Sequence, residues 1–517
     1  MPILGSIIKK AFELRNLPVE KQRRKQNPVV AQKRVLKKLL RKAQYTAIGE
    51  HYRFSDLLNS DNIIHDFKQA VPVHNYQTMY KRWWYRALNG ESYVTWPGKV
   101  KYFALSSGTS DASSKYIPIT SDMLSGIKQV SLRQLLYTTK INLPANFYEK
   151  GILMIGGSTH LQYNGTYYEG DLSGITAASI PFWFQHFYRP GRRISRTSDW
   201  ATKLDELVKK APSWDIGIIV GVPAWIQILM ERIISEYNVN TIHDIWPNLT
   251  IYVHSGVSFK PYLKSFEKLV SKPLIYNESY LASEGYIAFQ NGIDTRGMEL
   301  VVDNGIYFEF IPFNSDNFDD EGNFYKNPKT ISIAEVEEGV DYALLLSTNA
   351  GAWRYLLGDT IKFVDKSKSE IVITGRTSQF ISICGEHLSQ ENMNRAIELL
   401  QDELDVKIKE FTVAAVRHGN LFAHKWYIGT DDKLDNIRAS KIIDGNLKNL
   451  NDDYRVERME AIKDVCVSVL PSKAFYDYMK ISGKEGSANK FPRVLKNSRI
   501  QEWEDYLKSN NYSITNI

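Results

Sequence analysis

Apolar runs bounded by glycine constrain the fold of this chain more than any other feature. Residues 151–157 and 215–221 are two such runs, and each is followed by a candidate helix. Short continuous apolar runs of this kind are typical of strands that are buried on both faces of an α/β sheet. Residues 251–254 and 274–277 continue the alternation of strand and helix. The pattern therefore predicts a large α/β domain.

Strand content rises toward the end of that domain. Residues 301–311 predict a hairpin and residues 342–347 a further strand, so we expect a β-rich annex. The polar stretch at 365–369 has the composition of a hinge or a tight turn. Because a chain of 517 residues is too long for a single core, we predict a large N-terminal domain at 1–369 and a small, mobile α+β lid domain at 370–517.

The cysteine content bears on the compartment. Cys384 and Cys466 are the only cysteines, which excludes a disulfide framework and a cysteine-based metal site. We therefore expect a reducing, cytoplasmic compartment. The apolar run in residues 1–10 is too short for a signal peptide, and no run reaches the roughly 20 apolar residues of a membrane-spanning helix.

A basic helix is predicted near the N-terminus. Asn27 and Pro28 fit its N-cap and first residue, and Gly49 fits its end. Its apolar residues recur at helical spacing, namely Val35, Leu36, Leu39, Leu40 and Ala43. Such a helix is typical of nucleic-acid or membrane surfaces, but without aromatic interleaving or a nucleic-acid motif we favour a solvated outer face. The net charge of the whole chain, +7, is mild and is compatible with an anionic ligand such as a nucleotide.

The stretch 101–118 combines a strand with a loop rich in hydroxyl groups. After the apolar run, four hydroxyl residues surround Gly108, and Lys115 follows. The four residues are Ser106, Ser107, Thr109 and Ser110. Backbone N–H groups and hydroxyl donors around a flexible glycine can enclose a polyanion, as phosphate-binding loops do. An ordinary surface loop of Ser and Thr remains the alternative on this stretch alone.

Three further segments carry candidate chemistry. In residues 276–285 a carboxylate, a hydroxyl and an aromatic ring follow an apolar strand, a set that could hold magnesium, phosphate and a base, although a capped helix start explains it as well. In residues 353–360, Gly358 and Asp359 stand at a strand end, where the carboxylate could accept ribose hydroxyls. Residues 375–385, which begin with Gly375 and Arg376, lie at the expected hinge.

In this order, the segments resemble the motifs of the adenylate-forming enzymes, and most closely those of the Gretchen Hagen family of auxin-responsive acyl acid amido synthetases. The matching residues are 106–110, 280–284, and Arg354-Tyr355 with Gly358-Asp359; residues 307–312 and the opening helix also match. The chain departs from plant members at Leu281-Ala282 and at Trp353, which leaves the substrate open. The resemblance covers nearly the whole chain and implies the adenylate-forming architecture.

The resemblance also implies a two-step ligase reaction. ATP with Mg²⁺ and a small carboxylic acid would form an acyl adenylate, and the amine of an amino acid would then attack it. The implied roles are phosphate binding by Ser106, Ser107, Thr109 and Ser110, adenine binding by Tyr280, α-phosphate binding by Ser283, magnesium binding by Glu284, ribose binding by Asp359, and nucleotide binding by Arg376 after the hinge. Lys490, in residues 489–493, would be the catalytic lysine, although Lys484 and Lys496 stand nearby and a surface lysine is the alternative.

Other possibilities remain open at this stage. Trp183 and Trp225 are candidates for the acyl pocket, but core packing explains them as well. A ligase with coenzyme A or another thiol as acceptor shares the first half-reaction, and a non-catalytic nucleotide-binding or acyl-binding protein is a third reading. We expect neither nucleic-acid binding nor membrane insertion. The sequence has no P-loop, no G-x-G-x-x-G, no G-x-S-x-G and no H-E-x-x-H motif.

Overall fold

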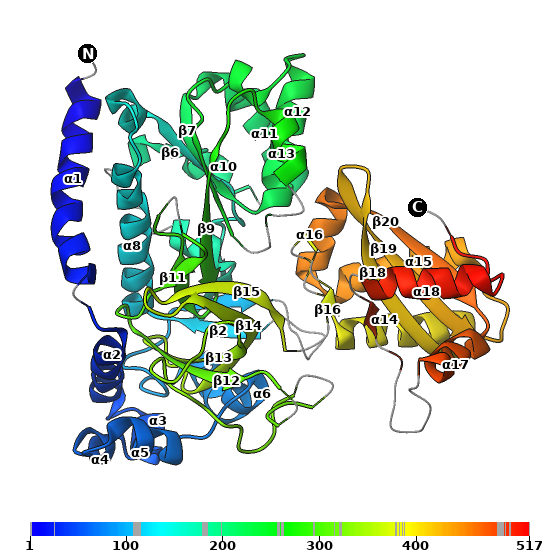
Figure 1. Cartoon of the computed structure of the whole chain (residues 1–517), viewed down its shortest axis with the longest axis horizontal. Helices are drawn as coiled ribbons and strands as arrows, with labels where there is room; N and C mark the ends of the chain where they lie inside the picture. Colours follow the sequence, from blue (N-terminus) through cyan, green and yellow to red (C-terminus); the bar gives the residue numbers. More distant parts are fainter. Residues whose placement is uncertain are drawn as a thin grey trace. The chain divides into compact units, whose positions relative to one another are not determined.

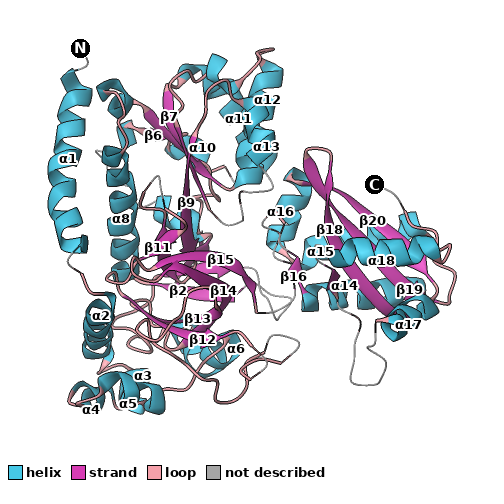
Figure 2. Cartoon of the chain, viewed as in Figure 1, coloured by secondary structure: helices cyan, strands magenta, loops and turns pink. Residues whose placement is uncertain are grey.

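The computed structural model shows a chain of two compact units (Figures 1 and 2). It describes residues 3–515 except 25, 107–114, 178–184, 198, 256–258, 260–262, 293–294, 315, 320–322, 378–379, 382, 385, 387, 483–490, 492 and 496–497. The large unit comprises Met1–Ser106, Lys115–Val222 and Leu229–Thr377, and the small unit consists chiefly of Ser378–Ile517.

An eleven-stranded sheet organises the large unit. Its order is β12 (Ile306–Pro312), β13 (Asp341–Thr348), β14 (Tyr355–Asp365), β15 (Glu370–Arg376), β11 (Met298–Leu300), β10 (Gly285–Phe289), β9 (Ile275–Ala282), β8 (Ile251–His254), β7 (Ile216–Gly221), β3 (Gly151–Met154) and β6 (Tyr188–Arg189). The strands from β6 to β9 pair in parallel, whereas all pairs from β9 to β12 are antiparallel. The sheet therefore changes from parallel to antiparallel between β9 and β10, and the predicted α/β class with a β-rich annex is confirmed.

A second, four-stranded sheet carries the hydroxyl-rich loop. Its order is β2 (Lys115–Ile119), β1 (Tyr102–Ser106), β5 (Tyr168–Gly170) and β4 (Gln162–Tyr163). β1 and β2 form an antiparallel hairpin in which Ser106 pairs with Lys115. The hydroxyl-rich loop therefore connects the two strands of this hairpin.

Helices surround the sheets of the large unit. They are α1 (Ile3–Arg24), α2 (Pro28–Ala43), α3 (Ala47–His51), α4 (Phe54–Leu58), α5 (Ile63–Ala70), α6 (Tyr76–Met79), α7 (Tyr85–Leu88), α8 (Ser121–Leu136), α9 (Leu172–Ala177), α10 (Arg192–Ser195), α11 (Trp200–Lys210), α12 (Pro223–Glu236) and α13 (Leu263–Leu269). The first six residues of α12, Pro223–Ile228, group with the small unit. Short irregular helical turns lie at Tyr80–Trp84, Tyr137–Lys140, Ala145–Glu149, Ala211–Ser213 and Ile242–Asp244. In the part of the chain that is described, no helix combines the length and the apolar composition of a membrane crossing.

The predicted basic helix is α2, and its N-terminus is confirmed. The Asn27 side chain accepts hydrogen bonds from the backbone N–H groups of Val29 and Val30. The five predicted apolar residues are all buried. The helix ends at Ala43 and not at Gly49, which lies in α3. Gln32, also buried, donates to the carbonyls of residues 302 and 306 and so fixes α2 beside β12.

The structure corrects the predicted hairpin at residues 301–311. Residues 301–305 form no strand, and β12 pairs with β13. The strand before the turn is β11, which pairs with β10 on one side and with β15, about 70 residues later, on the other. Local apolar pattern could not show this, because the partner strand is far away in the sequence.

The polar stretch at 365–369 is the tight turn between β14 and β15, in which Asp365 pairs with Glu370. The two strands form one hairpin, so a division at 369/370 would cut through it. The large unit continues to Thr377. The break between the two units thus falls eight residues after the boundary that the composition suggested.

The small unit contains a four-stranded sheet with helices. The sheet order is β20 (Ile462–Leu470), β19 (Leu421–Thr430), β18 (Ile408–His418) and β21 (Val494–Leu495), next to a short pair of β16 (Phe380–Ile381) with β17 (Leu388–Ser389). The helices are α14 (Gln390–Leu404), α15 (Asn436–Leu450), α16 (Asp452–Glu460), α17 (Ser472–Ile481) and α18 (Ser498–Ser509). Near its start, the fully buried carboxylate of Glu386 lies 3.0 Å from His424 Nε2 and accepts the backbone N–H of Cys384 at 2.9 Å.

Candidate active site

The turn between β9 and β10 presents the first candidate residues. Ser283 and Glu284 are the only residues between the two strands, at the point where the sheet changes direction. Gly285 follows with φ of +149°, and a Cβ there would lie 2.7 Å from the Ile306 side chain, so the tight return requires glycine. Ligands of open α/β sheets bind beyond the carboxyl ends of parallel strands, and β9 is such a strand.

Asp359 is the centre of a buried polar cluster beside this turn. It follows Gly358, which has φ of +95°, and it pairs in register with Arg376 of β15. Its Oδ1 lies 2.6 Å from Arg376 Nε, and its Oδ2 accepts the hydroxyl of Tyr280 from β9. Asp359 is only 6% exposed. Three predicted residues, separated by up to 96 positions in the sequence, thus meet in one place.

Glu284 is electrostatically part of the same cluster. Burial raises the pKa of Glu284 to about 7, and the negative charge of Asp359 adds to the increase. The positive charges of Lys115 and Arg376 act in the opposite direction. Burial, together with the negative charge of Glu284, also holds the pKa of Tyr355 well above its usual range. Two carboxylates and two cations therefore lie close enough to influence one another.

Lys115 and Tyr355 belong to this cluster although no role was predicted for either. Lys115 lies at the mouth of the β1–β2 hairpin, opposite Ser106, and its Nζ is 5.4 Å from the ring centre of Tyr76. The signal in the sequence was its position immediately after the hydroxyl-rich loop. The predicted phosphate ligands Ser107, Thr109 and Ser110 lie outside the described residues, as do Trp183 and Lys490.

Trp225 is the predicted acyl-pocket residue that the structure describes. It lies in the first turn of α12, which begins directly after the carboxyl end of β7, and it is half-buried. That edge of the parallel strands is also the edge from which Ser283 projects. The position is compatible with an acid-binding role, which stays a prediction.

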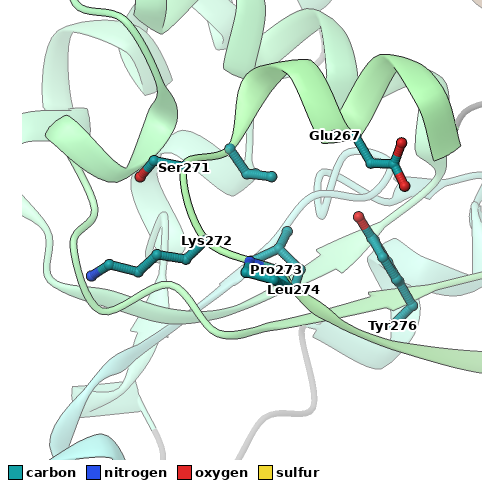
Figure 3. Close-up of a pocket in the computed structure, with 7 residues that line it drawn as sticks. Glu267, Ser271, Lys272, Pro273, Leu274 and Tyr276 are labelled. Carbon is teal, nitrogen blue, oxygen red and sulfur yellow. The ribbon is translucent and has the colours of Figure 1, made fainter.

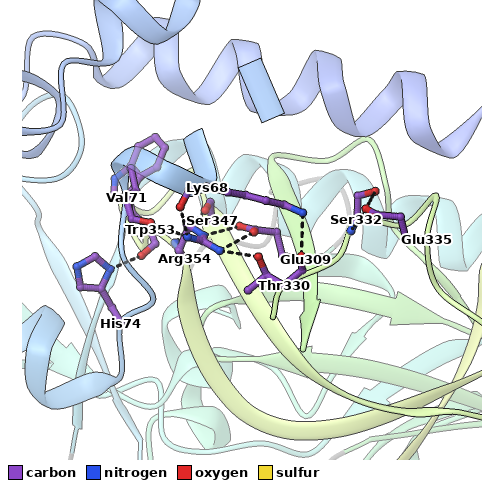
Figure 4. Close-up of polar contacts among 10 residues, drawn as sticks. All are labelled: Lys68, Val71, His74, Glu309, Thr330, Ser332, Glu335, Ser347, Trp353 and Arg354. Carbon is purple, nitrogen blue, oxygen red and sulfur yellow. Dashed lines mark hydrogen bonds and ion pairs between the residues drawn. The ribbon is translucent and has the colours of Figure 1, made fainter. Parts of the chain in front are cut away.

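Arg354, in the segment that resembles a nucleotide motif, forms a buried ion pair (Figure 4). Its guanidinium forms a two-pronged ion pair with Glu309, with both N–O distances at 3.0 Å. The Arg354 side chain is 5% exposed and that of Glu309 1%. Further bonds reach the carbonyls of Lys68 and Val71 at 2.8 and 2.6 Å and the Thr330 hydroxyl at 2.8 Å. Arg354 therefore joins the N-terminal helices to the sheet and takes no place beside Asp359.

A surface pocket of about 270 Å³ lies at the other end of β9 (Figure 3). Its lining residues are Glu267, Val270, Ser271, Lys272, Pro273, Leu274 and Tyr276. The strand rises about 3.3 Å per residue, so the seven steps from Ile275 to Ala282 separate this pocket from the Ser283 turn by roughly 20 Å. The pocket is therefore separate from the cluster around Asp359.

The metal-binding capacity of the cluster is small. Among the residues that the structure describes, no three His, Cys, Asp or Glu side chains gather in the way a protein metal cage requires. A magnesium ion bound to a nucleotide needs less, because phosphate oxygens and water supply most of its ligands and one or two carboxylates complete them. The buried carboxylate of Glu284 fits that requirement.

Comparison with known proteins identifies two family domains. The profile of the GH3 family N-terminal domain matches residues 20–207, and that of the GH3 family central domain matches residues 299–376. Together they cover just over half of the chain. The first match includes Ser106, the second includes Asp359 and Arg376, and Glu284 lies between them.

Whole-chain similarity is lower but extensive. The jasmonoyl–L-amino acid synthetase JAR6 of Nicotiana attenuata is 23% identical in an alignment of 483 positions that covers 78% of this chain and 80% of that protein. Matches to three other curated plant relatives span 30–47% of the relatives' own length. Among solved structures, a GH3.15 acyl acid amido synthetase aligns with a TM-score of 0.58 at 16% identity, over 97% of this chain and 96% of that one. A 2-hydroxyisobutyryl-CoA ligase aligns with a TM-score of 0.57 at 13% identity, over 95% and 94%.

Proposed function

This chain belongs to the GH3 family, and on that premise we propose that it is an ATP-dependent acyl acid–amido synthetase. It would adenylate a small carboxylic acid and transfer the acyl group to the amine of an amino acid. The observation that carries the proposal is the meeting of Tyr280, Glu284, Asp359 and Arg376 at the junction of the parallel and antiparallel strands. These residues come from separate motifs, and a single buried cluster of them suits one shared ligand.

The nucleotide is the ligand that this cluster suits best. Asp359 would accept the ribose hydroxyls, because a buried carboxylate forms strong charge-assisted hydrogen bonds. Its bonds to Tyr280 and Arg376 hold it in place for that task. Lys115 and Arg376 offer positive charge to phosphate oxygens, as would the donors of residues 106–110. The ring of Tyr280 is the proposed adenine contact, and Ser283 is the proposed contact of the α-phosphate.

Magnesium is the proposed cofactor beside ATP, and Glu284 would hold it. A buried carboxylate whose pKa lies near 7 is poorly compensated, and a nearby cation would favour its charged form. When bound, the ion supplies positive charge at the phosphate oxygens. Glu284 would orient that charge, while Lys115 and Arg376 bind the remaining phosphate oxygens.

Screening acids for ATP–pyrophosphate exchange tests the first half-reaction. Acid-dependent exchange that requires magnesium is the expected result, and no exchange with any acid of a broad panel would refute the proposal. The acceptor is then identified by AMP release from the loaded enzyme with amino acids or with coenzyme A. Release driven by thiols and not by amines would replace the amido synthetase by an acyl–thiol ligase that shares the same adenylation site.

Several parts of the proposal lie outside the cluster. We place the reaction in the cytoplasm, which the two free thiols of Cys384 and Cys466 support. The small unit is the proposed lid, and Lys490 is its proposed catalytic residue. Lys490→Ala should lower exchange by ~100-fold or more and leave ATP affinity within a few-fold, because the lysine acts on charge that develops in the transition state. Amide formation from a preformed acyl adenylate should stay near the parent rate; an equal defect there would refute this role.

A further inference from the structure

The N-terminal segment concentrates the positive charge of this protein. Residues 1–43 contain thirteen Lys and Arg against two Glu, a net charge of +11, whereas the whole chain carries +7. The remaining residues, 44–517, are therefore net negative, at −4. Charge asymmetry of this size between parts of a chain indicates a polyanionic or membrane-surface partner. Nothing in the proposed ligase reaction uses it.

The inner side of α1 is fixed to the large unit. Ile8 and Phe12 pack against a core formed by residues of the turns Tyr137–Lys140 and Ala145–Glu149, of the segment 141–143 between them, and of β7 and β8. The backbone N–H of Gly5 donates to Glu149 Oε1 at 2.6 Å, and Asn16 Nδ2 donates to Thr139 Oγ1 at 2.8 Å. α1 is therefore a docked helix with a defined outer side (Figure 1).

One flank of that outer side is apolar. Leu4, Ile7 and Leu14 are 55%, 61% and 61% exposed, and Ala11 between them is also exposed. With 100° per residue, these four positions form a continuous stripe about 80° wide. Leu17, 65% exposed, lies close to its end. Lone exposed apolar residues are common, but an ordered stripe on a docked helix marks a contact surface.

Positive charges border the stripe. Arg15 lies about 20° beyond Leu4 on the helix circumference, and Lys10 lies about 40° beyond Leu14. Both are exposed, as is Lys21. α2 begins four residues after the end of α1 and adds an exposed basic face together with Val30, which is 55% exposed. The exposed basic residues of that face are Lys33, Arg34, Lys38, Arg41 and Lys42.

We propose that the outer face of α1, with the basic face of α2, docks on an anionic lipid surface. An apolar stripe with basic borders is the pattern of helices that lie in a membrane interface, with the apolar side toward the acyl chains and the cations at the headgroups. Each Lys or Arg near such a surface strengthens binding, and salt weakens it. The contact is peripheral, and it would bring the ligase to a membrane without inserting a span.

Two other occupants fit the same surface less well. A second copy of α1 would place the basic borders of both helices against each other, and like charges repel. A nucleic acid would satisfy the cations but would leave Leu4, Ile7 and Leu14 without an apolar partner. An anionic lipid surface satisfies the stripe and the charges together.

Sedimentation of the full-length protein with vesicles tests the proposal. Vesicles of phosphatidylcholine with phosphatidylserine should bind the protein, and vesicles of phosphatidylcholine alone should bind it at least about tenfold less. Ile7→Glu with Leu14→Glu should reduce binding by about tenfold or more, because the stripe would then carry charge into the interface. Lys10→Glu with Arg15→Glu should weaken binding to the anionic vesicles by about tenfold or more, although the basic face of α2 still contributes attraction, and should leave the weak binding to phosphatidylcholine vesicles unchanged.

Matched controls come from the small unit. Ile437→Glu changes an apolar residue on α15 that is 67% exposed, and Lys473→Glu reverses an exposed charge on α17. Both should bind as the parent does, and all variants should retain ATP–pyrophosphate exchange. The proposal would be overturned if the protein does not sediment with vesicles, if it binds both vesicle types equally, or if the control variants lose as much binding as the stripe variants. It would also be overturned if the stripe is found to mediate dimers or RNA binding instead.

Discussion

Replacing Arg354 by alanine should strongly destabilise the large unit. The substitution leaves the Glu309 carboxylate, 1% exposed, without its ion-pair partner, and the carbonyls of Lys68 and Val71 lose their donors. Breaking a buried ion pair from one side costs about 3–5 kcal/mol. Since total stabilities are about 5–15 kcal/mol, such a loss is large.

Urea unfolding of the full-length protein measures this effect. Arg133→Ala is the matched control, because Arg133 forms a comparable two-pronged pair with Asp303 at 2.6 and 3.0 Å but at 31% and 21% exposure. Both partners of this pair remain partly accessible to water, which can solvate Asp303 when Arg133 is removed, so the control should cost clearly less than Arg354→Ala.

The double variant Arg354→Met with Glu309→Leu makes the reasoning refutable even if Arg354→Ala fails to fold. Removing both charges should recover much of the loss, although the two carbonyls still lack donors. An Arg354→Ala protein within about 1 kcal/mol of the parent, or a double variant no more stable than the single one, would refute the assignment of a buried charge.

Three further predictions concern Glu284 and Asp359 of the buried cluster, and His74, whose Nδ1 contacts the backbone carbonyl of Trp353 next to Arg354. Glu284→Gln should lower magnesium-dependent exchange by ~100-fold or more, and Glu267→Gln, at the other end of β9, should not; equal exchange in the two variants would remove Glu284 from the reaction. Asp359→Asn should weaken ATP binding by about tenfold or more in calorimetry because it loses a charge-assisted acceptor. Asp359 lies within β14 and not at a strand end as the sequence suggested, and Asp365→Asn, at the last residue of that strand, should bind ATP as the parent does. Burial lowers the pKa of His74 to about 4, so the folded state binds fewer protons than the unfolded chain between pH 6.5 and 4. Stability should therefore fall by about 3 kcal/mol as the pH drops through that window, and a His74→Gln protein that keeps the full pH dependence, as the exposed control His65→Gln should, would contradict the origin in His74.

The local sequence pattern was sufficient to predict two of the elements. The apolar run bounded by glycine predicted β7, which is a buried strand, and the amphipathic pattern after Asn27 predicted α2. The same logic failed at residues 301–304, where Val301 and Val302 are apolar but the segment forms a turn. The strand pairing there is decided by β15, far along the chain. The apolar pattern of a segment shows that it could form a buried strand. Whether the strand forms depends on a partner strand that the local pattern does not reveal.

The candidate site was also predicted only in part from the sequence. Glu284 and Asp359, which come from separate motifs, belong to one cluster in the structure, and their roles in the reaction stay predictions. The sequence did not predict that Arg376 pairs with Asp359, because this pairing depends on the register of β14 against β15. The sequence also did not predict which way the Arg354 side chain points. Its φ of +41° and the Glu309 carboxylate on β12 turn it away from the neighbouring Asp359.

The position of β11 has a consequence for the order in which the protein is made. This three-residue strand pairs with β10 on one edge, but its other edge has no partner until residues 370–371 of β15 have been synthesised. An unpaired strand edge is a site of misassociation for an incomplete chain. Arrival of β15 covers that edge and, through its last residue, Arg376, also brings the cation to Asp359. A nascent chain that has closed this part of the sheet has also assembled the cluster around Asp359, so the two events should coincide in limited proteolysis of ribosome-bound chains.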